Sequence, residues 1–414
     1  MLSLRAILSL IGKIKIKERN LLIITLLAIF LIGYGIIEYQ LHLRYLRRIP
    51  IRVHVNGTRG KSSVTRLISA GLRSGNLRAV AKTTGTSPCM IYEDGKDRLI
   101  HRLGKANIKE QMPVIRKLSD RNPDAMVIEC MALQPILQKI TEHKLVQSTV
   151  GVITNVRPDH LDVMGPTVKD VAIAFSGTIP KKSILFTSET DNELLQILKK
   201  KARSLGSEVK PVAAAWVTSE EMSGFSYFEW KDNVSLALTV CQYLGVERDI
   251  ALQGMYSMTP DPGALKIYRI EFFNKIIEFA NGFAANDPES TILLSKNLGI
   301  GTKDRQFSIF IVNCRADKIQ RSEQLAELIA HKLNGNRYVL TGTFTRAVYD
   351  EAIRLGIDEE LMVDLGGKKV EDIFEAVVEL AQPRTIVVGI GNMVGLGDEI
   401  VNYFSARGLN EFGV

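Results

Sequence analysis

The chain has 414 residues, enough for two or three domains that each bury a core. Its net charge is +8, and the first 52 residues, with nine lysines and arginines against two glutamates, carry +7 of it. The remaining body is nearly neutral, which argues against a nucleic-acid-binding protein. Four widely separated cysteines form no C-x-x-C pair and indicate neither a zinc site nor a disulfide framework; they fit a reducing cytosol: Cys89, Cys130, Cys241 and Cys314.

An uncharged, mostly apolar run covers residues 21–37, with lysines and arginines on both sides. At about 1.5 Å per residue it is at the short end of what crosses a bilayer core of roughly 30 Å. We predict a membrane helix within a segment 1–48 whose basic flanks face anionic lipid headgroups. A cleaved signal peptide is the alternative, but no small-x-small cleavage site follows.

Short β-branched runs alternate with helical stretches after this segment, which is typical of a parallel α/β sheet. In a central domain, 49–260, strands are expected at 51–55, 79–81, 125–128, 150–156 and 184–187. A mostly helical stretch ends at the proline- and glycine-rich residues 259–263, which favours a boundary near residue 260. A smaller, Rossmann-like α/β domain, 261–414, is expected to contain strands at 276–280, 307–312, 338–340 and 385–389.

The clearest motif follows the first expected strand and leads into a helix: Gly57, Thr58, Arg59, Gly60, Lys61, Ser62 and Ser63. Glycines allow backbone N–H groups to wrap around phosphate oxygens, and the helix N-terminus adds positive potential. Lys61 would reach the outer phosphates of ATP, and the Ser62 hydroxyl would ligate Mg²⁺. The full P-loop pattern has glycine where this chain has Val55, but the strand–loop–helix context favours a nucleotide site over a structural glycine turn.

Two later strand ends carry polar groups. Glu129 ends an apolar strand, where P-loop enzymes place a carboxylate near Mg²⁺. His160, flanked by Asp159 and Asp162, follows the strand expected at 150–156, on the ligand-binding edge of an open α/β sheet. The local pattern supports a structural and a catalytic role for His160 equally.

In this order, these motifs resemble those of the Mur ligase superfamily, which includes peptidoglycan amino-acid ligases and folylpolyglutamate synthetases. The chain is most similar to one branch, the ligase subunits of bacterial poly-γ-glutamate synthases. Five separated segments carry that resemblance: 83–86, 129–132, 163–167, 281–287 and 313–317. It extends over nearly the whole chain and includes a hydrophobic N-terminal segment.

The resemblance implies a ligase that activates a carboxylate with ATP as an acyl phosphate and then forms an amide, ADP and phosphate. Lys61 would bind the β and γ phosphates, and Ser62 and Glu129 would hold a first Mg²⁺ or Mn²⁺. His160 would hold a second metal ion near the substrate. Arg315 would complete the catalytic set of Lys61, His160, Glu129 and Arg315 by approaching from the C-terminal domain.

Further contacts are implied in the same way. Asn233 would contact adenine, and Asp287 would lie near the ribose. The expected substrate contacts are Thr83, Thr84, Asn286 and Asp317.

The chain departs from its relatives at two positions. Many of them carry a carbamylated lysine at a second metal ion, where this chain has Ser176. Relatives often have an arginine that contacts phosphate after the linker Pro-Gly, where this chain has Ala264. Another group such as Asp159 or a water molecule would then complete the metal site.

The resemblance predicts an enzyme that polymerises glutamate through bonds between γ-carboxylate and α-amine groups. Its partners would be glutamate, the growing poly-γ-glutamate and membrane-embedded synthase and export subunits, without nucleic acid. A homo-oligomer is expected. Because ATP is cytosolic, the single span would place the catalytic body on the cytoplasmic face of the cell membrane.

Two other functions compete with this prediction. Another Mur-type ligase would add one amino acid to a cell-wall or folate-like acceptor. A membrane-anchored P-loop regulator, such as a tyrosine autokinase, would carry a clustered tyrosine tail, whereas residues 390–414 contain only Tyr403. A non-enzymatic scaffold would not need Glu129 and His160 beside a phosphate loop.

Overall fold

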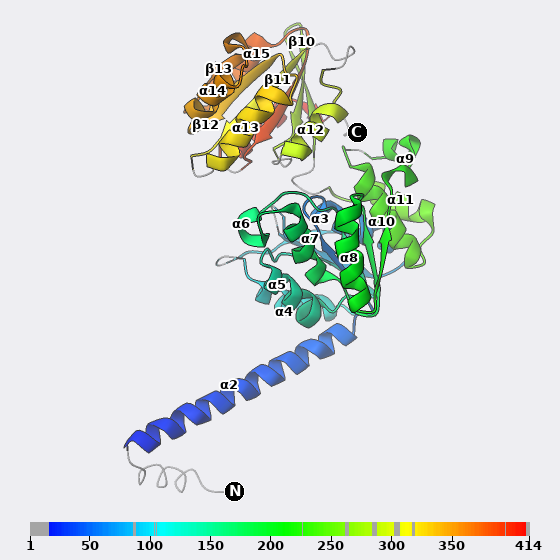
Figure 1. Cartoon of the computed structure of the whole chain (residues 1–414). Coiled ribbons are helices and arrows are strands. Elements are labelled where there is room, and N and C mark those ends of the chain that lie inside the picture. The colour runs from blue at the N-terminus through cyan, green and yellow to red at the C-terminus, as the bar shows by residue number, and fades with distance from the viewer. Residues whose placement is uncertain are drawn as a thin grey trace.

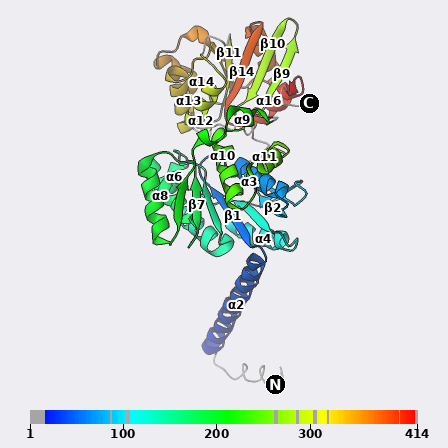
Figure 2. The ribbon, with the colours of Figure 1, turned by 90° about the vertical axis from the view of Figure 1, so that its right-hand side faces the viewer.

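The computed structural model describes residues 16–85, 88–102, 104, 106–225, 227–260, 265–283, 288–301, 307–316, 319–393 and 395–410. A long helix, α2 (Ile16–Arg47), is followed by a first sheet with its helices and then by a second sheet with its helices (Figure 1). The perpendicular view keeps α2 and the second sheet at opposite ends (Figure 2). The mixed α/β architecture confirms the predicted fold class, while the boundary near residue 260 stays a prediction.

Helix α2 contains the predicted apolar run. Its residues Asn20–Arg47 are long and apolar enough to cross a membrane, a test that a signal sequence also passes. The last turns of α2 differ, because His42 and Leu46 are buried. His42 Nε2 lies 2.8 Å from the carbonyl oxygen of Leu145, and α2 packs against α4 (Gln111–Ser119). The end of α2 is therefore part of the protein core rather than a free linker.

The first sheet has eight strands in the order β4-β3-β2-β5-β1-β6-β7-β8. Its strands are β1 (Ile51–Asn56), β2 (Ala79–Lys82), β3 (Cys89–Ile91), β4 (Asp97–Leu99), β5 (Ala125–Glu129), β6 (Val150–Ile153), β7 (Ile184–Thr187) and β8 (Glu208–Pro211). All pairs are parallel except β2 with β3 and β3 with β4. Strand β1 lies between β5 and β6, so the loop after it opens at a switch point of the sheet.

The strand expected at 150–156 ends early, at Ile153. The reason is that Thr154 and Asn155 leave the sheet to contact the loop that follows β1: the Thr154 hydroxyl donates to the carbonyl of Arg59 at 2.5 Å. The helical stretch expected at 232–256 forms two helices, α10 (Lys231–Tyr243) and α11 (Arg248–Tyr256), because Gly245 with φ +89° ends the first. Both helices pack against α3 (Lys61–Ser74).

The remaining helices of the first part are α5 (Pro135–Ile140), a π-helix at Thr141–Val146, α6 (Leu161–Met164), α7 (Val168–Phe175), α8 (Asn192–Ser204) and α9 (Ser219–Ser223). The second sheet has the order β13-β12-β11-β14-β10-β9-β15. Its strands are β9 (Ile267–Phe272), β10 (Lys275–Asn281), β11 (Ser308–Cys314), β12 (Arg337–Gly342), β13 (Met362–Asp364), β14 (Arg384–Gly391) and β15 (Leu409–Asn410). Its helices are α12 (Pro288–Asn297), α13 (Ile319–His331), α14 (Thr345–Arg354), α15 (Val370–Leu380) and α16 (Leu396–Ser405).

Candidate active site

The phosphate loop joins the carboxyl end of β1 to the start of α3 and needs both of its glycines. Gly57 has φ +129° and Gly60 has φ +80°, values that side chains other than hydrogen strain. A Cβ atom at Gly60 would lie 2.3 Å from Oδ1 of Asn233, and one at Gly57 would lie 2.1 Å from Oγ1 of Thr154. The loop therefore packs too closely on its neighbours for larger residues.

Asn155 fixes the loop from the end of β6. Its carbonyl accepts the N–H of Thr58 at 3.0 Å, and its Oδ1 accepts the N–H of Arg59 at 3.1 Å. Its Nδ2 donates to the carbonyl of Arg59 at 3.2 Å. The Arg157 N–H donates to the Thr58 hydroxyl at 2.9 Å. These contacts use the inner side of the loop and leave the first turn of α3 facing the cavity described below.

Lys61 folds back over the loop that precedes it. Its Nζ donates to the carbonyls of Gly57 at 2.7 Å and Thr58 at 3.0 Å. Burial lowers the pKa of Lys61, and the charge of Glu129 opposes that shift. The ammonium group is thus held at the N-terminus of α3, where an anion is stabilised.

Glu129 lies across from Lys61 at the end of β5, and its residue is 2 % exposed. Its Oε2 accepts the Ser62 hydroxyl at 2.8 Å and the N–H of Thr84 at 2.6 Å. The structure therefore brings together the two predicted magnesium ligands. Mg²⁺ is usually bound by one or two protein oxygens together with phosphates and water, so Ser62 and Glu129 fit this ion. Within the described ranges, no cluster of three or more His, Cys, Asp or Glu side chains is present.

The proposed second metal position is less complete. The His160 side chain is 46 % exposed, and its Nε2 lies 3.8 Å from Oδ1 of Asp159. Its backbone has φ +48°, at the start of α6. The Ser176 hydroxyl donates to the carbonyl of Ile173 at 2.6 Å. The metal role of His160 stays a prediction.

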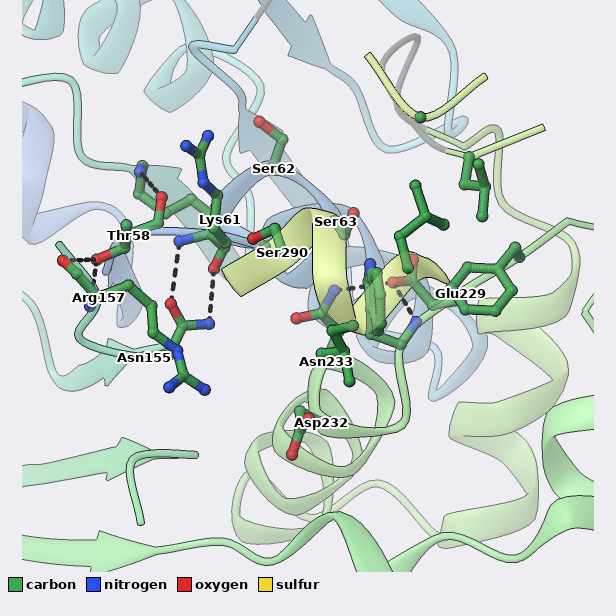
Figure 3. A pocket seen from close by; sticks show the side chains of 18 of the residues that line it. Thr58, Lys61, Ser62, Ser63, Asn155, Arg157, Glu229, Asp232, Asn233 and Ser290 are labelled. Carbon is green, nitrogen blue, oxygen red and sulfur yellow. Dashed lines mark hydrogen bonds between the residues drawn. The ribbon is translucent and has the colours of Figure 1, made fainter. Parts of the chain in front are cut away.

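A cavity of about 560 Å³ lies between the two sheets, with walls from both (Figure 3). The phosphate loop, Gly85, Glu129, Asn155 and Arg157 line one side. Helix α12 and the end of β10 line the other, and Ser290 of α12 lies close to Lys61 in the figure. The residues from the second part are Leu265, Asn281, Gly282, Ser290, Ile292, Leu293, Leu294 and Lys296. A nucleotide in this cavity would contact both parts of the protein.

Some predicted residues lie elsewhere. His160, Arg315, Thr83 and Thr84 do not line the cavity, although Thr84 touches Glu129 through its N–H. Their direct roles stay predictions. Asn286, Asp287 and Asp317, like Ala264, lie outside the described residues.

The sequence did not single out the wall around Asn233. Glu229 is buried there and accepts hydrogen bonds from Asn233 Nδ2 at 2.8 Å and from the N–H of Trp230 at 2.9 Å. The Phe228 and Trp230 rings meet edge to face, with centroids 5.0 Å apart. All four residues line the cavity. The aromatic–acid–aromatic run at 228–230, directly before a helix, was the available signal.

Two family models match the chain. The Mur ligase middle domain matches residues 55–256, and the poly-gamma-glutamate synthase CapB C-terminal domain matches residues 267–407. The capsule biosynthesis protein CapB of Bacillus anthracis is 37% identical over 382 residues, covering 92% of this chain and 82% of that protein. The PGA synthase CapB of Bacillus subtilis strain 168 is 37% identical over 386 residues, covering 92% and 96%.

The chain belongs to the CapB family. This CapB-family chain is therefore an ATP-dependent amide ligase, as the sequence predicted. A Mycobacterium tuberculosis folylpolyglutamate synthase complexed with ADP and AMPPCP has the same fold, with a TM-score of 0.64 and 17% identity, covering 90% of this chain and 95% of that one. A bifunctional folylpolyglutamate synthase/dihydrofolate synthase from Yersinia pestis, complexed with AMPPNP and Mn, gives 0.62 at 15% identity, covering 88% and 92%.

We expect Glu229→Gln to raise the KM for ATP of this CapB-family chain by about 10-fold, because a hydrogen bond to a charged acceptor is worth roughly 1.5–3 kcal/mol. The Asn233 amide would lose its anchor and present a less fixed edge to the nucleotide. Steady-state kinetics with ATP and glutamate varied in turn would check this. Glu220→Gln, on the exposed α9, is the matched control. A change confined to kcat would contradict the role of Glu229.

Proposed function

We propose that this chain polymerises glutamate into poly-γ-glutamate at the cytoplasmic face of the cell membrane. ATP would phosphorylate a γ-carboxylate to a γ-glutamyl phosphate, and the α-amine of a second glutamate would attack its carbonyl carbon. Phosphate would leave and the amine would lose a proton, which gives an amide. The 37% identity to CapB proteins over 92% of the chain carries this proposal.

The cavity residues support the first step. The γ-phosphate and the attacked carboxylate are both anions, so their approach needs cations and N–H donors. Lys61 and the N-terminus of α3 supply these on the phosphate side. Ser62 and Glu129 would hold a divalent cation, which neutralises phosphate charge when bound.

The second part would close on the nucleotide. Helix α12 brings Ser290 and Lys296 to the cavity wall opposite the phosphate loop. Lys296 has no ion pair in the described part of the chain, so its charge is available to a polyphosphate. Closure would also bring Arg315, which follows β11, toward the reacting groups.

The location of the enzyme follows from α2. Its apolar stretch would cross the membrane, and its buried end would hold the body at a fixed orientation beneath the bilayer. The second sheet lies at the end opposite to α2, so the cavity would face the cytosol and its ATP (Figures 1 and 2). Membrane-embedded subunits would export the polymer, and we expect a homo-oligomer.

Product mass tests the polymer assignment directly. Incubation of the full chain with ATP, Mg²⁺ and glutamate, with its membrane partners, should give a ladder of products spaced by one glutamyl unit. A ligase that makes a single addition would give one adduct in the presence of a folate-like or cell-wall acceptor. Mass spectrometry separates the two outcomes, and a single adduct without a ladder would reject polymerisation.

A further inference from the structure

A completely buried lysine lies beside Glu129. Lys82 ends β2, directly before Thr83 and Thr84, and its side chain is 0 % exposed. In the β2–β5 pair it lies opposite Ile128, one position before Glu129. The charges of Lys82 and Glu129 interact, yet no hydrogen bond joins the two side chains in the described structure. Lys82 is thus a second cation, with Lys61, close to this carboxylate.

Glu110 binds the Lys82 ammonium instead. Nζ of Lys82 lies 2.8 Å from Oε1 of Glu110, and its only other polar contact in the described ranges is Met131 Sδ at 3.6 Å. Arg102 holds Glu110 in turn, with Nε 2.6 Å from Oε2 and Nη2 3.1 Å from Oε1. Alternating charges therefore run from the partly exposed Arg102 through Glu110 and Lys82 to Glu129.

Stability alone does not explain this arrangement. A buried ion pair is often no more stabilising than apolar side chains of the same size. The residues that follow the two partners, Thr83 and Gln111, also carry three of the nine buried side-chain atoms without a hydrogen-bond partner in the described structure. Unsatisfied polar groups collect where a protein is organised for function rather than for maximal stability.

We propose that Glu110 is a positioning residue that holds the Lys82 ammonium away from Glu129, so that Glu129 remains available to a divalent cation. This inference rests on the proposed metal role of Glu129. In a water-poor interior, an ammonium group that loses its partner is drawn to the nearest carboxylate. Without Glu110, Lys82 would pair with Glu129 and compete with the metal ion.

The test is a double-mutant cycle on metal activation. In the full chain, Glu110→Gln should raise the Mn²⁺ concentration for half-maximal ATP turnover by about 10-fold, the lower end for loss of a group that orients a metal ligand. Adding Lys82→Met should bring it back to within about 3-fold of the wild type, because the competing cation is gone. Electron paramagnetic resonance of Mn²⁺ with the protein and ADP gives the same comparison without turnover.

A merely structural role predicts a different pattern. The two substitutions would then lower the unfolding temperature and kcat, with no rescue by Lys82→Met. Either an unchanged Mn²⁺ requirement in Glu110→Gln or the absence of rescue would overturn the inference. Arg102→Gln, which removes the outer anchor of Glu110, should shift the requirement in the same direction by less, and it serves as a second variant if Glu110→Gln folds poorly.

Two further variants complete the design. Arg78→Met removes the Arg78–Asp124 pair at the opposite edge of the same β2–β5 strands and should leave metal activation unchanged. Glu129→Gln should lose most of the Mn²⁺ response. If Glu129→Gln keeps a normal response, the metal assignment itself is wrong and this inference fails with it. If Glu129→Gln loses the response while Glu110→Gln does not, only the positioning role fails.

Discussion

Replacement of Lys61 by alanine is expected to lower glutamate-dependent ATP turnover by about 10³-fold or more, since charge stabilisation at a transferred phosphoryl group is worth factors of this size. The ammonium group already lies over the loop, bound to the carbonyls of Gly57 and Thr58. A γ-phosphate at the start of α3 would meet it directly. No other side chain approaches the loop carbonyls in this way in the described part of the chain, so Lys61 has no substitute there.

The loss should be chemical rather than structural. Removing a buried charge that is bound only to loop carbonyls leaves no unpaired ion, so the unfolding temperature of Lys61→Ala should stay near that of the wild type. Lys117→Ala, on the exposed side of α4, controls for a general effect of losing a lysine. Near-normal turnover in Lys61→Ala would reject the assignment of this loop to ATP.

Glu142→Gln is expected to destabilise the folded protein by about 3 kcal/mol, because it breaks a buried ion pair on one side only. Glu142 lies on the π-helix, and its Oε2 is 2.8 Å from Nδ1 of His54 in β1. Its Oε1 accepts the N–H and the hydroxyl of Ser148, both at 2.9 Å. Thermal unfolding should show a decrease in Tm of about 5–10 °C for a unit of this size.

The stability loss should depend on pH in a defined direction. Burial opposes the charge on His54, but its contacts with Cys130 and Glu142 outweigh burial and raise the pKa of His54 from 6.5 to about 10. A raised pKa gives stability that is fully present below 6.5 and is lost as the pH rises through about 10. The difference in Tm between wild type and Glu142→Gln should therefore be large at pH 6 and small at pH 10.

A surface pair provides the control. Lys169 and Glu193 lie 2.8 Å apart, but both side chains are more than half exposed. Glu193→Gln should change stability by less than about 1 kcal/mol at either pH, because water screens such pairs. A Tm gap for Glu142→Gln that stays constant from pH 6 to pH 10 would contradict a charged His54 in the folded protein.

The sequence predicted the strands that are buried and missed those that are not. All nine predicted strands are present, and the buried run at Ile184–Thr187 has the predicted bounds. The missed strand β4 (Asp97–Leu99) is exposed along its length, and β8 (Glu208–Pro211) nearly so. Such short strands form because a neighbour offers hydrogen bonds, and their own residues show no alternation that would reveal them.

The sequence by itself determined the phosphate loop, because strand, glycines, lysine and helix start are contiguous and their chemistry is local. It also placed Glu129 at a strand end, and the structure confirmed its contact with Ser62. The second wall of the cavity was decided only by the tertiary structure, because helix α12 reaches the loop through the packing of two separate sheets. The same holds for the pairs of Lys82 with Glu110 and of His54 with Glu142, since no local pattern shows which distant charge a buried group will meet.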